Sequence, residues 1–271
     1  MPHDLVYPRL QQNKVNRYDK RATYDLSTIH NIINNSLVLH VSFAPSPDDP
    51  FPAILPMIGV MGSFEHPSAG SDEPLDCYLH GYVSSRLMRL AASSSFSVEE
   101  STEREGAPDP GLPVCIAGTK VDGLVLSLTP NSHSYNYRSA VLQGYATSVT
   151  DTAEKVWAME QITEKVVRGR WSKTRVPPDK VEMDSTKILR VRIVSGSGKR
   201  REGGPHDDRK DTERSEVTRE VWTGTVPVWE TFGEPIVGGD GAANVVPPYL
   251  AEYLSTINER NEKYAVNAGK E

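Results

Sequence analysis

Hydrophobic and polar positions alternate along several short stretches of the chain. In residues 37–43 every second side chain is apolar, and residues 187–194 repeat the pattern. A period of two predicts strands with one buried face. Residues 51–61 are also extended, but Pro52 and Pro56 cannot donate to a sheet ladder, so this strand is expected at an edge or at bulges. Further strands are predicted at 77–81, 113–119, 121–128, 138–149 and 220–229.

Four helices are predicted, each from a starting signal followed by apolar residues at helical spacing. Asp25 is a candidate N-cap, and Asp151 with Glu154 forms a candidate capping box. The expected helices cover 25–35, 84–92, 151–169 and 247–264. Helices interspersed with closely spaced strands indicate an α+β chain with a mainly antiparallel sheet, for which closure into a barrel is expected.

Composition narrows the class of protein. Gly 20 and Pro 20 disfavour a helical bundle, and 199–220 holds seven basic and seven acidic residues, which is typical of a solvated loop. The net charge of −6 gives no indication of a nucleic-acid face, and no apolar run is long enough for a membrane span. The first residues lack a signal-peptide pattern, and Cys77 and Cys115 are too few for a metal cluster. A cytoplasmic protein with free thiols is expected.

The segment 77–91 carries the first candidate site. His80 and Gly81 end a strand, and two serines with Arg86 fall at the start of a helix. Unpaired backbone N–H groups at a helix start, two hydroxyls and a guanidinium together form a phosphate cradle. The alternative, a plain serine cap followed by a surface arginine, is equally consistent with this segment. The three residues of the candidate cradle are Ser84, Ser85 and Arg86.

A second candidate lies in 132–140. Tyrosines beside an arginine and a serine suit a ligand that has both a ring and a phosphate. The alternative is a strand start with surface tyrosines. The residues concerned are Asn136, Tyr137, Arg138 and Ser139, next to Tyr135. His80 is a candidate base or ring contact, although a packed structural histidine is commoner.

Several segments, in order, resemble the nitroimidazole-reductase-like flavoproteins of the pyridoxamine 5'-phosphate oxidase-like group. The segments are RYDKRATYDLSTIHNIINNSLVLHVSF (17–43), CYLHGYVSSRLMRL (77–90), VDGLVLS (121–127), NYRSAVLQGYA (136–146), VVRGRW (166–171) and VWTGTVPVW (221–229).

This resemblance implies a split β-barrel, an FMN cofactor and a homodimer with the cofactor near the subunit interface. It implies a phosphate role for the cradle and for Arg138 and Ser139, and a place beside the flavin for His80 and Gly81. It adds Lys120, Asp122 and Gly123 at a strand turn near the cofactor, and Trp222 near the site. His80 is also the candidate catalytic residue. The remaining cofactor-binding candidates are Asn136 and Tyr137.

The expected organisation is an N-terminal arm (1–16), a split-barrel flavin domain (17–246) with insertions at 63–74, 94–111 and 199–220, and a C-terminal helix and tail (247–271). The expected function is an FMN-dependent oxidoreductase that reduces a small organic substrate, nitroreductase-like. The alternative is a non-catalytic flavin- or haem-binding module of the same fold, and related barrels also use a deazaflavin. Neither nucleic acid nor membrane is expected as a partner.

Overall fold

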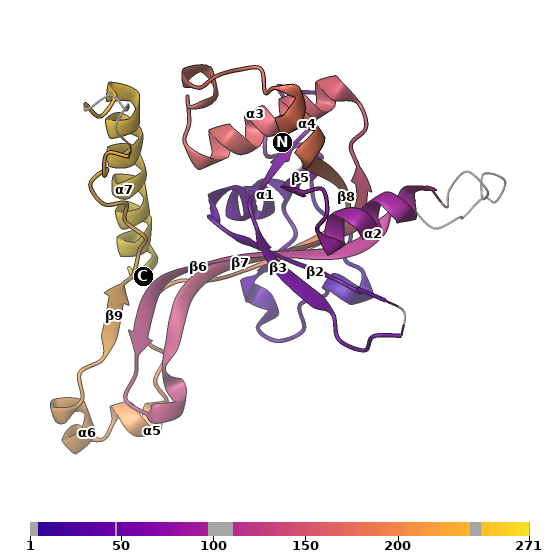
Figure 1. Ribbon diagram of the computed structural model, residues 1–271. Helices are drawn as coiled ribbons and strands as arrows, with labels where there is room; N and C mark the ends of the chain where they lie inside the picture. The colour runs from indigo at the N-terminus through magenta and orange to yellow at the C-terminus, as the bar shows by residue number, and fades with distance from the viewer. Residues whose placement is uncertain (1–4, 47, 97–110, 239–244, 271) are drawn as a thin grey trace. The chain divides into compact units, whose positions relative to one another are not determined.

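The computed structural model describes residues 5–46, 48–96, 111–238 and 245–270 (Figure 1). The chain divides into two compact units. Unit 1 comprises Met1–Thr119 and Ser139–Gly198, and unit 2 comprises Lys120–Arg138 and Lys199–Glu271. The boundary falls inside three long strands, so each of these strands contributes residues to both units. The expected arm, barrel domain and tail stay a prediction.

The strands form one sheet in the order β3-β2-β6-β7-β8-β5-β4, with β1 on β8 and β9 on β6. The registers of β2 with β3 and β6, of β5 with β4 and β8, and of β6 with β9 are antiparallel. The path is open at β3 and β4, so the closure into a barrel that the element order suggested is wrong, and the split barrel that the resemblance implied is confirmed. The registers confirm the predicted mainly antiparallel α+β fold. The strands are β1 (Ala22–Thr23), β2 (Leu39–Phe43), β3 (Ala53–Met57), β4 (Gly59–Gly62), β5 (Asp76–Tyr82), β6 (Leu112–Leu126), β7 (Ser134–Ser148), β8 (Thr186–Arg201) and β9 (Gly224–Pro227).

The helices begin largely where their caps predict. The Asp25 carboxylate accepts a hydrogen bond from the backbone N–H of Thr28 at 2.7 Å, and Asp151 accepts one from Glu154 at 2.7 Å. Each satisfies a backbone donor that the first helical turn leaves unpaired. The helices are α1 (Leu26–Asn35), α2 (Arg86–Phe96), α3 (Thr152–Val166), α4 (Lys180–Ser185), α5 (Arg209–Thr212), α6 (Ser215–Glu220) and α7 (Pro248–Ala268), with 3₁₀ turns η1 (Gln11–Asn13), η2 (Asp19–Arg21), η3 (Pro130–Ser132) and η4 (Trp171–Lys173).

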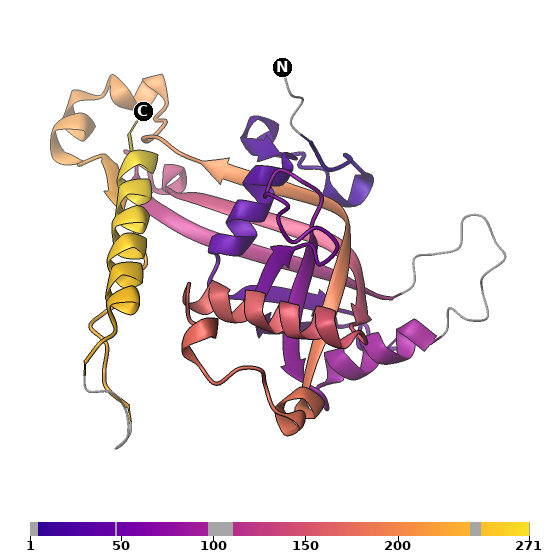
Figure 2. The ribbon, with the colours of Figure 1, turned by 90° about the horizontal axis from the view of Figure 1, so that it is seen from above.

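The core of unit 1 has two parts, one on each face of β5. Cys77 and Leu79 point into the larger cluster, where α1, α2 and β2 bury Ile29, Leu87 and Val41 completely. The opposite face of β5 and the neighbouring β8 are covered by α3, which lies across the strands in Figure 2. Residues that alternate along β5 therefore face either the main core or α3. The second cluster consists of Tyr78, Ala158, Ile162 and Ile188.

The described part of the N-terminal arm, residues 5–16, packs on the rest of unit 1. The Tyr7 hydroxyl lies 2.6 Å from His30 Nε2 on α1, and both residues are buried. The Asn13 side chain, which is 5% exposed, donates to the backbone oxygen of Gly196 on β8 at 2.9 Å. These contacts bury polar groups with partners, so residues 5–16 belong to the folded unit.

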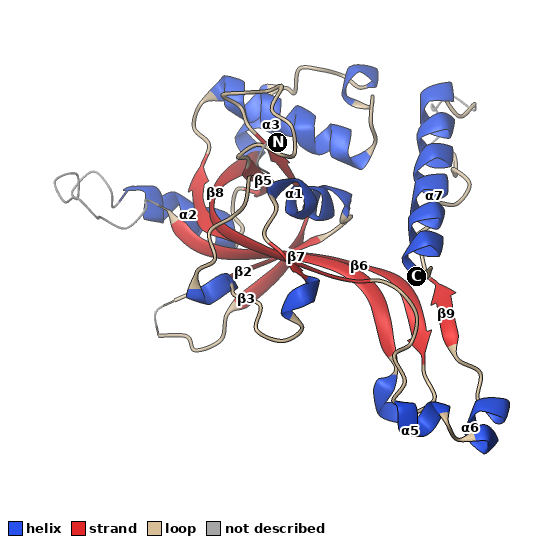
Figure 3. Cartoon of the chain, turned by 180° about the vertical axis from the view of Figure 1, so that it is seen from behind, coloured by secondary structure: helices blue, strands red, loops and turns tan. Residues whose placement is uncertain are grey.

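Four local predictions are wrong. The strands expected at 113–119 and 121–128 are one strand, β6, which runs without interruption in Figure 3. Its glycine forms no turn because Gly123 pairs with Pro227 of β9. The expected loop 199–220 contains the end of β8 and two short helices. In the capping box, the Glu154 carboxylate instead accepts from the Tyr78 hydroxyl at 2.9 Å. The loop expected at 94–111 begins with the last residues of α2, and 97–110 lie outside the described residues.

Within the described ranges, no helix has both the length and the apolar composition that crossing a bilayer requires. The same part of the chain contains no group of three or more His, Cys, Asp or Glu side chains arranged to hold a metal ion.

Candidate functional site

The candidate phosphate cradle lies where β5 turns into α2. The backbone N–H of Ser85 donates to Tyr82 at 2.9 Å, and Arg89 donates to the Ser85 oxygen at 3.1 Å, so the helix starts directly after the serine pair. Ser84 and Arg86 are exposed, and Ser85 is half-buried. Within the described residues, no hydrogen bond or ion pair engages these three side chains. Two hydroxyls and a guanidinium are therefore available at a helix start.

Gly81 lies against Met88, one of the buried residues of α2. A Cβ atom at this position would lie 2.6 Å from the terminal methyl of Met88 and 3.5 Å from its Cγ. The methyl is the end of a flexible side chain, so a shift of Met88 accommodates a small residue at position 81 without moving the helix backbone.

His80 lies on the face of β5 that is turned toward α3, and its ring lines a pocket of ≈340 Å³. This volume lies within the range of small-molecule sites. The walls are largely apolar, and burial lowers the pKa of His80 below its ordinary value. At neutral pH the ring is uncharged, so one ring nitrogen keeps a lone pair and the other carries a proton. The other lining residues are Ile58, Met159, Ile162, Thr163, Val166, Arg170, Trp171 and Thr186.

The rim of this His80 pocket is held in place by Glu164 of α3. Its carboxylate accepts from the backbone N–H groups of Gly169 at 2.5 Å and Trp171 at 2.8 Å. Gly169 has a φ of 79°, a conformation that favours glycine. Charge-assisted bonds to two N–H groups fix the loop after α3. Lys165 secures the helix itself, because its ammonium donates to the backbone oxygens of Gly59 at 2.5 Å and Ile33 at 3.1 Å. Burial lowers the Lys165 pKa to about 8.

Most of the remaining candidates belong to unit 2, where they form an ion-pair network. Arg138 Nη2 donates to Asp122 Oδ1 at 2.9 Å, and Nε lies 3.1 and 3.2 Å from the two carboxylate oxygens. The Asp122 side chain is 4% exposed and that of Arg138 13%. The guanidinium carbon lies 3.4 Å from the centre of the Tyr264 ring on α7. The second cation, Lys120, pairs with Glu230 at 2.6 Å.

Asn136 receives the C-terminal end of α7. Its side-chain amide donates to the backbone oxygens of Ala268 at 2.9 Å and Gly203 at 3.1 Å, and its oxygen accepts from the Arg201 guanidinium. Thr225 of β9 adds a bond to the Gly269 oxygen at 3.2 Å. The last carbonyls of a helix lack partners within the helix, and these side chains supply them. The network joins β6, β7 and β9 to α7.

The structure thus brings the candidates together in two groups, one in each unit. His80, Gly81 and the cradle form the group in unit 1. Lys120, Asp122, Asn136 and Arg138 form the group in unit 2. They bind one another, α7 and the loop before it, and Asn136 also binds Arg201 and Gly203. The expected strand turn at Gly123 does not exist, because this residue lies within β6. Tyr137 and Ser139 are half-buried on β7, and Trp222 is 63% exposed.

The other walls of the His80 pocket are not predictable from the sequence pattern. Arg170 and Trp171 lie in the segment 166–171, which contributes to the family resemblance but carries no site prediction. Thr186 and Met159 carry no motif, and they reach the pocket only because α3 crosses β5 and β8. The alternation along β5 is the sequence feature that points to this pocket. His80 and Tyr78 lie on the same face of the strand, and a large tyrosine ring on that face indicates that another element packs over it.

The pattern of the family described as pyridoxamine 5'-phosphate oxidase matches residues 25–200, which is most of the chain. The chain belongs to this family. The match covers α1, the His80 pocket, the cradle and the strands from β2 to β8. It confirms the resemblance that the ordered segments indicated. No curated protein has a significant sequence match.

Two solved structures share the fold of this family member. The flavocytochrome Anf3 from Azotobacter vinelandii is 22% identical, with a TM-score of 0.66, over 90% of this chain and 97% of that one. The FAD and heme binding protein from Mycobacterium smegmatis is 22% identical, with a TM-score of 0.67, over 86% of this chain and 97% of that one. Both alignments extend well beyond the 176 residues that the family pattern covers, so the fold likeness includes regions outside it.

Proposed function

We propose that this protein binds a flavin, FMN in the first instance, and acts as an oxidoreductase on a small organic substrate, in the manner of a nitroreductase. The observation that carries the proposal is the cradle at the β5–α2 junction, in a chain of the pyridoxamine 5'-phosphate oxidase family. Ser84, Ser85 and Arg86 offer donors that no described residue engages. The names of both structural neighbours, a flavocytochrome and an FAD and heme binding protein, support a flavin.

The cradle residues and His80 have different roles in the proposed flavin site. The cradle holds the phosphate, because hydroxyls, helix N–H groups and a guanidinium favour a bound dianion. His80 and Gly81 lie beside the ring, and a neutral His80 has a proton to donate near it. A bound flavin supplies the redox chemistry, and the protein supplies binding, orientation and access. We further propose a homodimer in the cytoplasm that completes the site with its second copy.

The unit 2 candidates fit a cofactor less directly. Arg138 would reach a phosphate only by leaving Asp122, and a buried arginine that leaves its carboxylate partner is costly. Asn136 and Lys120 are likewise engaged with partners in their own unit. We therefore assign the phosphate role to Arg86. Ser139, Tyr137, Gly123 and Trp222 stay cofactor-binding predictions.

Replacing Arg86 with alanine tests the phosphate role. A charge-assisted hydrogen bond contributes about 1.5–3 kcal/mol, so FMN binding is expected to weaken about ten-fold or more. Arg89→Ala is the matched control, because Arg89 is an exposed arginine on the same helix. Fluorescence titration of the apoprotein with FMN and with FAD measures both affinities and decides between the two flavins. Equal dissociation constants for the Arg86 and Arg89 variants would remove Arg86 from the site, and a protein that binds neither flavin would refute the function.

A haem protein, with or without a flavin, is the second candidate. The observation that favours it is the His80 pocket: largely apolar walls, an uncharged imidazole and an arginine at the rim. A neutral imidazole is a common axial ligand of haem iron, and Arg170 suits a propionate. The absorption spectrum of the purified protein distinguishes the candidates. A Soret band that disappears in His80→Ala supports this candidate, and flavin bands without a Soret band exclude it.

A further inference from the structure

A second pocket of unit 1 lies in the N-terminal segment, away from the residues assigned above. Residues 9–24 contain five basic residues and one acidic residue, a formal charge of +4 in a chain whose net charge is −6. Clustered cations repel one another, and this cost is offset where an anion binds between them. The concentration of positive charge in one short segment therefore needs a structural explanation.

The fold brings part of this charge to one pocket of ≈380 Å³. Arg9 and Lys14 line it from either side of the η1 turn, and Asp19 contributes one carboxylate. The Asp19 side chain accepts from the backbone N–H of Lys20 at 2.9 Å, so it is engaged with its own turn. Within the described residues, neither Arg9 nor Lys14 has an acidic partner. We refer to this cavity as the arm pocket; its other lining residues are Val15, Ala22 and Tyr24.

The arm pocket is preformed. Asn13, buried between the two cations, accepts from the backbone N–H of Leu10 at 2.8 Å and donates to the oxygens of Pro8 and Gly196. This fixes the turn that carries Arg9 and Lys14. The Arg9 guanidinium lies over the Tyr24 ring, with its carbon 4.6 Å from the ring centre. Tyr24 is buried, and its hydroxyl accepts from the backbone N–H of Val15 at 3.1 Å.

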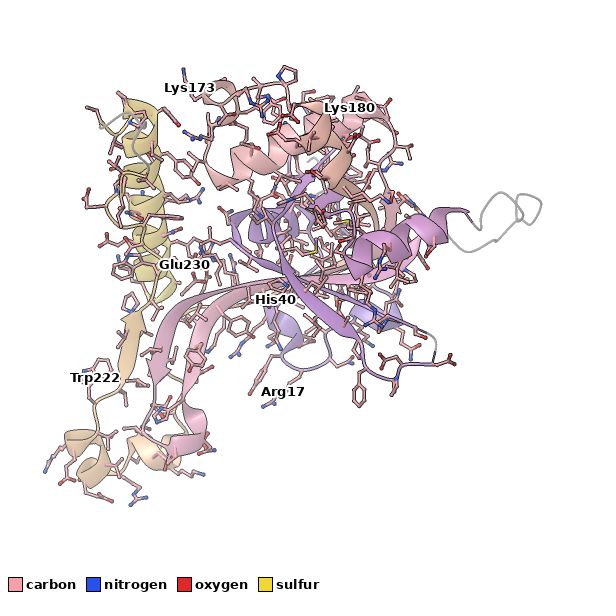
Figure 4. All side chains as sticks on the ribbon, viewed as in Figure 1. Arg17, His40, Lys173, Lys180, Trp222 and Glu230 are labelled. Atoms are coloured by element: carbon pink, nitrogen blue, oxygen red, sulfur yellow. The ribbon has the colours of Figure 1, made fainter. Side chains whose placement is uncertain are left out.

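The same segment carries further positive charge outside the lining of this pocket. Arg17, labelled in Figure 4, and Arg21 both lie over the Tyr18 ring, at 5.1 and 4.4 Å from its centre. Stacking on aromatic rings fixes guanidinium groups without neutralising them. The segment thus keeps several cations in defined positions, which suits recognition of a charged ligand better than a mobile solvated surface does.

We propose that the arm pocket binds a phosphorylated small molecule of the nucleotide class. Arg9 and Lys14 contact the phosphate oxygens, since a guanidinium fork and an ammonium are the groups that bind phosphate in proteins. The outer face of the Arg9 guanidinium, opposite Tyr24, is a flat surface on which a base can stack. This site uses no residue assigned to the flavin or to the His80 pocket, so it is independent of the proposed function.

Isothermal titration of the full-length protein with ADP, and separately with inorganic phosphate, tests the proposal. Arg9→Gln and Lys14→Gln are each expected to weaken ADP binding about ten-fold or more, as loss of one charge-assisted contact predicts. Lys180→Gln is the control, because Lys180 is an exposed lysine elsewhere in unit 1 (Figure 4). This variant should bind ADP with the affinity of the unchanged protein. Arg86→Ala should also leave ADP binding unchanged, which separates this site from the flavin cradle.

The ligands identify what the pocket recognises. Stronger binding of ADP than of phosphate supports a nucleotide, and equal binding of the two supports recognition of the phosphate group alone. Lys14→Gln keeps the test decisive if Arg9→Gln loosens the fold, because the Lys14 side chain stacks on no ring in the structure's described part. Absence of ADP and phosphate binding, or affinities of both glutamine variants equal to that of the control, would overturn the proposal.

Discussion

The Asp122–Arg138 ion pair provides the most informative single substitution, Asp122→Asn. The change keeps the size of the side chain but removes the charge that faces the guanidinium. Arg138 then remains beneath Tyr264 with an amide in place of a carboxylate, at a position where only 13% of its side chain is exposed. The effect of the substitution distinguishes two roles for this ion pair, stabilisation of unit 2 and binding of a cofactor.

The magnitude follows from burial. Breaking a buried ion pair by removing one partner costs about 3–5 kcal/mol, because the other charge stays buried without compensation. The contact of Arg138 with the Tyr264 ring is present before and after the substitution, so it does not change the difference. The asparagine amide oxygen still accepts one hydrogen bond, which keeps the loss near the lower end of this range. We expect the free energy of unfolding to fall by about 3 kcal/mol, a large part of the stability of an ordinary domain. The loss should be concentrated in α7 and β9.

Urea unfolding gives the free energy, and hydrogen exchange locates the loss. Amides of α7 should exchange faster in Asp122→Asn, while those of α1 and β2 keep their protection. The control is Glu213→Gln, which removes an ion pair with Arg209 in the same unit, where the side chains are 60% and 90% exposed. An exposed pair contributes at most about 1 kcal/mol. An Asp122 variant as stable as this control, but with weakened flavin binding, would refute the structural role and return the pair to the cofactor site.

Three further predictions concern unit 1. Burial lowers the pKa of His30, so below pH ~6.5 the unfolded chain binds more protons than the folded one. The free energy of unfolding should therefore fall as the pH drops from ~6.5 toward the pKa of the folded state. Urea titrations at several pH values measure this dependence, and His30→Gln should flatten it. Glu164→Gln should accelerate hydrogen exchange of the Gly169 and Trp171 amides by about ten-fold, since it weakens two charge-assisted bonds, and unchanged protection would show that the rim does not depend on Glu164. Burial raises the Cys77 pKa to about 12, so iodoacetamide at mild pH should label this thiol only after unfolding, and rapid labelling of the native protein would contradict its burial.

Local patterns predicted the elements whose causes are local. The carboxylate of Asp25 and the isoleucine spacing after it determine where α1 begins and which face it buries, and both are visible in ten consecutive residues. The edge position of β3 followed from Pro56 in the same way. The family resemblance then added what spacing cannot give, the split-barrel fold.

Contacts between distant residues were not predictable from the sequence. Asp122 and Arg138 are charged residues on predicted strands, and nothing in either segment shows that they pair or that Tyr264 covers them. Conversely, the family resemblance implied a strand turn at Gly123, whereas the pairing with β9 keeps β6 extended there. The His80 pocket was missed for the same reason, since its walls are assembled from separate elements.

The division of the chain into two units determines whether its C-terminal region can be transferred to another protein as an independent module. The family pattern ends at residue 200, yet unit 2 contains 120–138 from within that pattern, together with Lys199–Glu271. Asn136, whose amide caps the end of α7, lies on β7, within the residues that the family pattern matches. The Ala268 carbonyl that it binds lies beyond residue 200, outside that pattern. The C-terminal region is therefore not a portable module. Grafted onto another protein without β6 and β7, α7 would keep the caps from Gly203 and Thr225 but would lose the Asn136 amide from its last turn. A relative that acquires this region therefore needs a compatible residue at this position of β7 to keep the end of α7 fully capped.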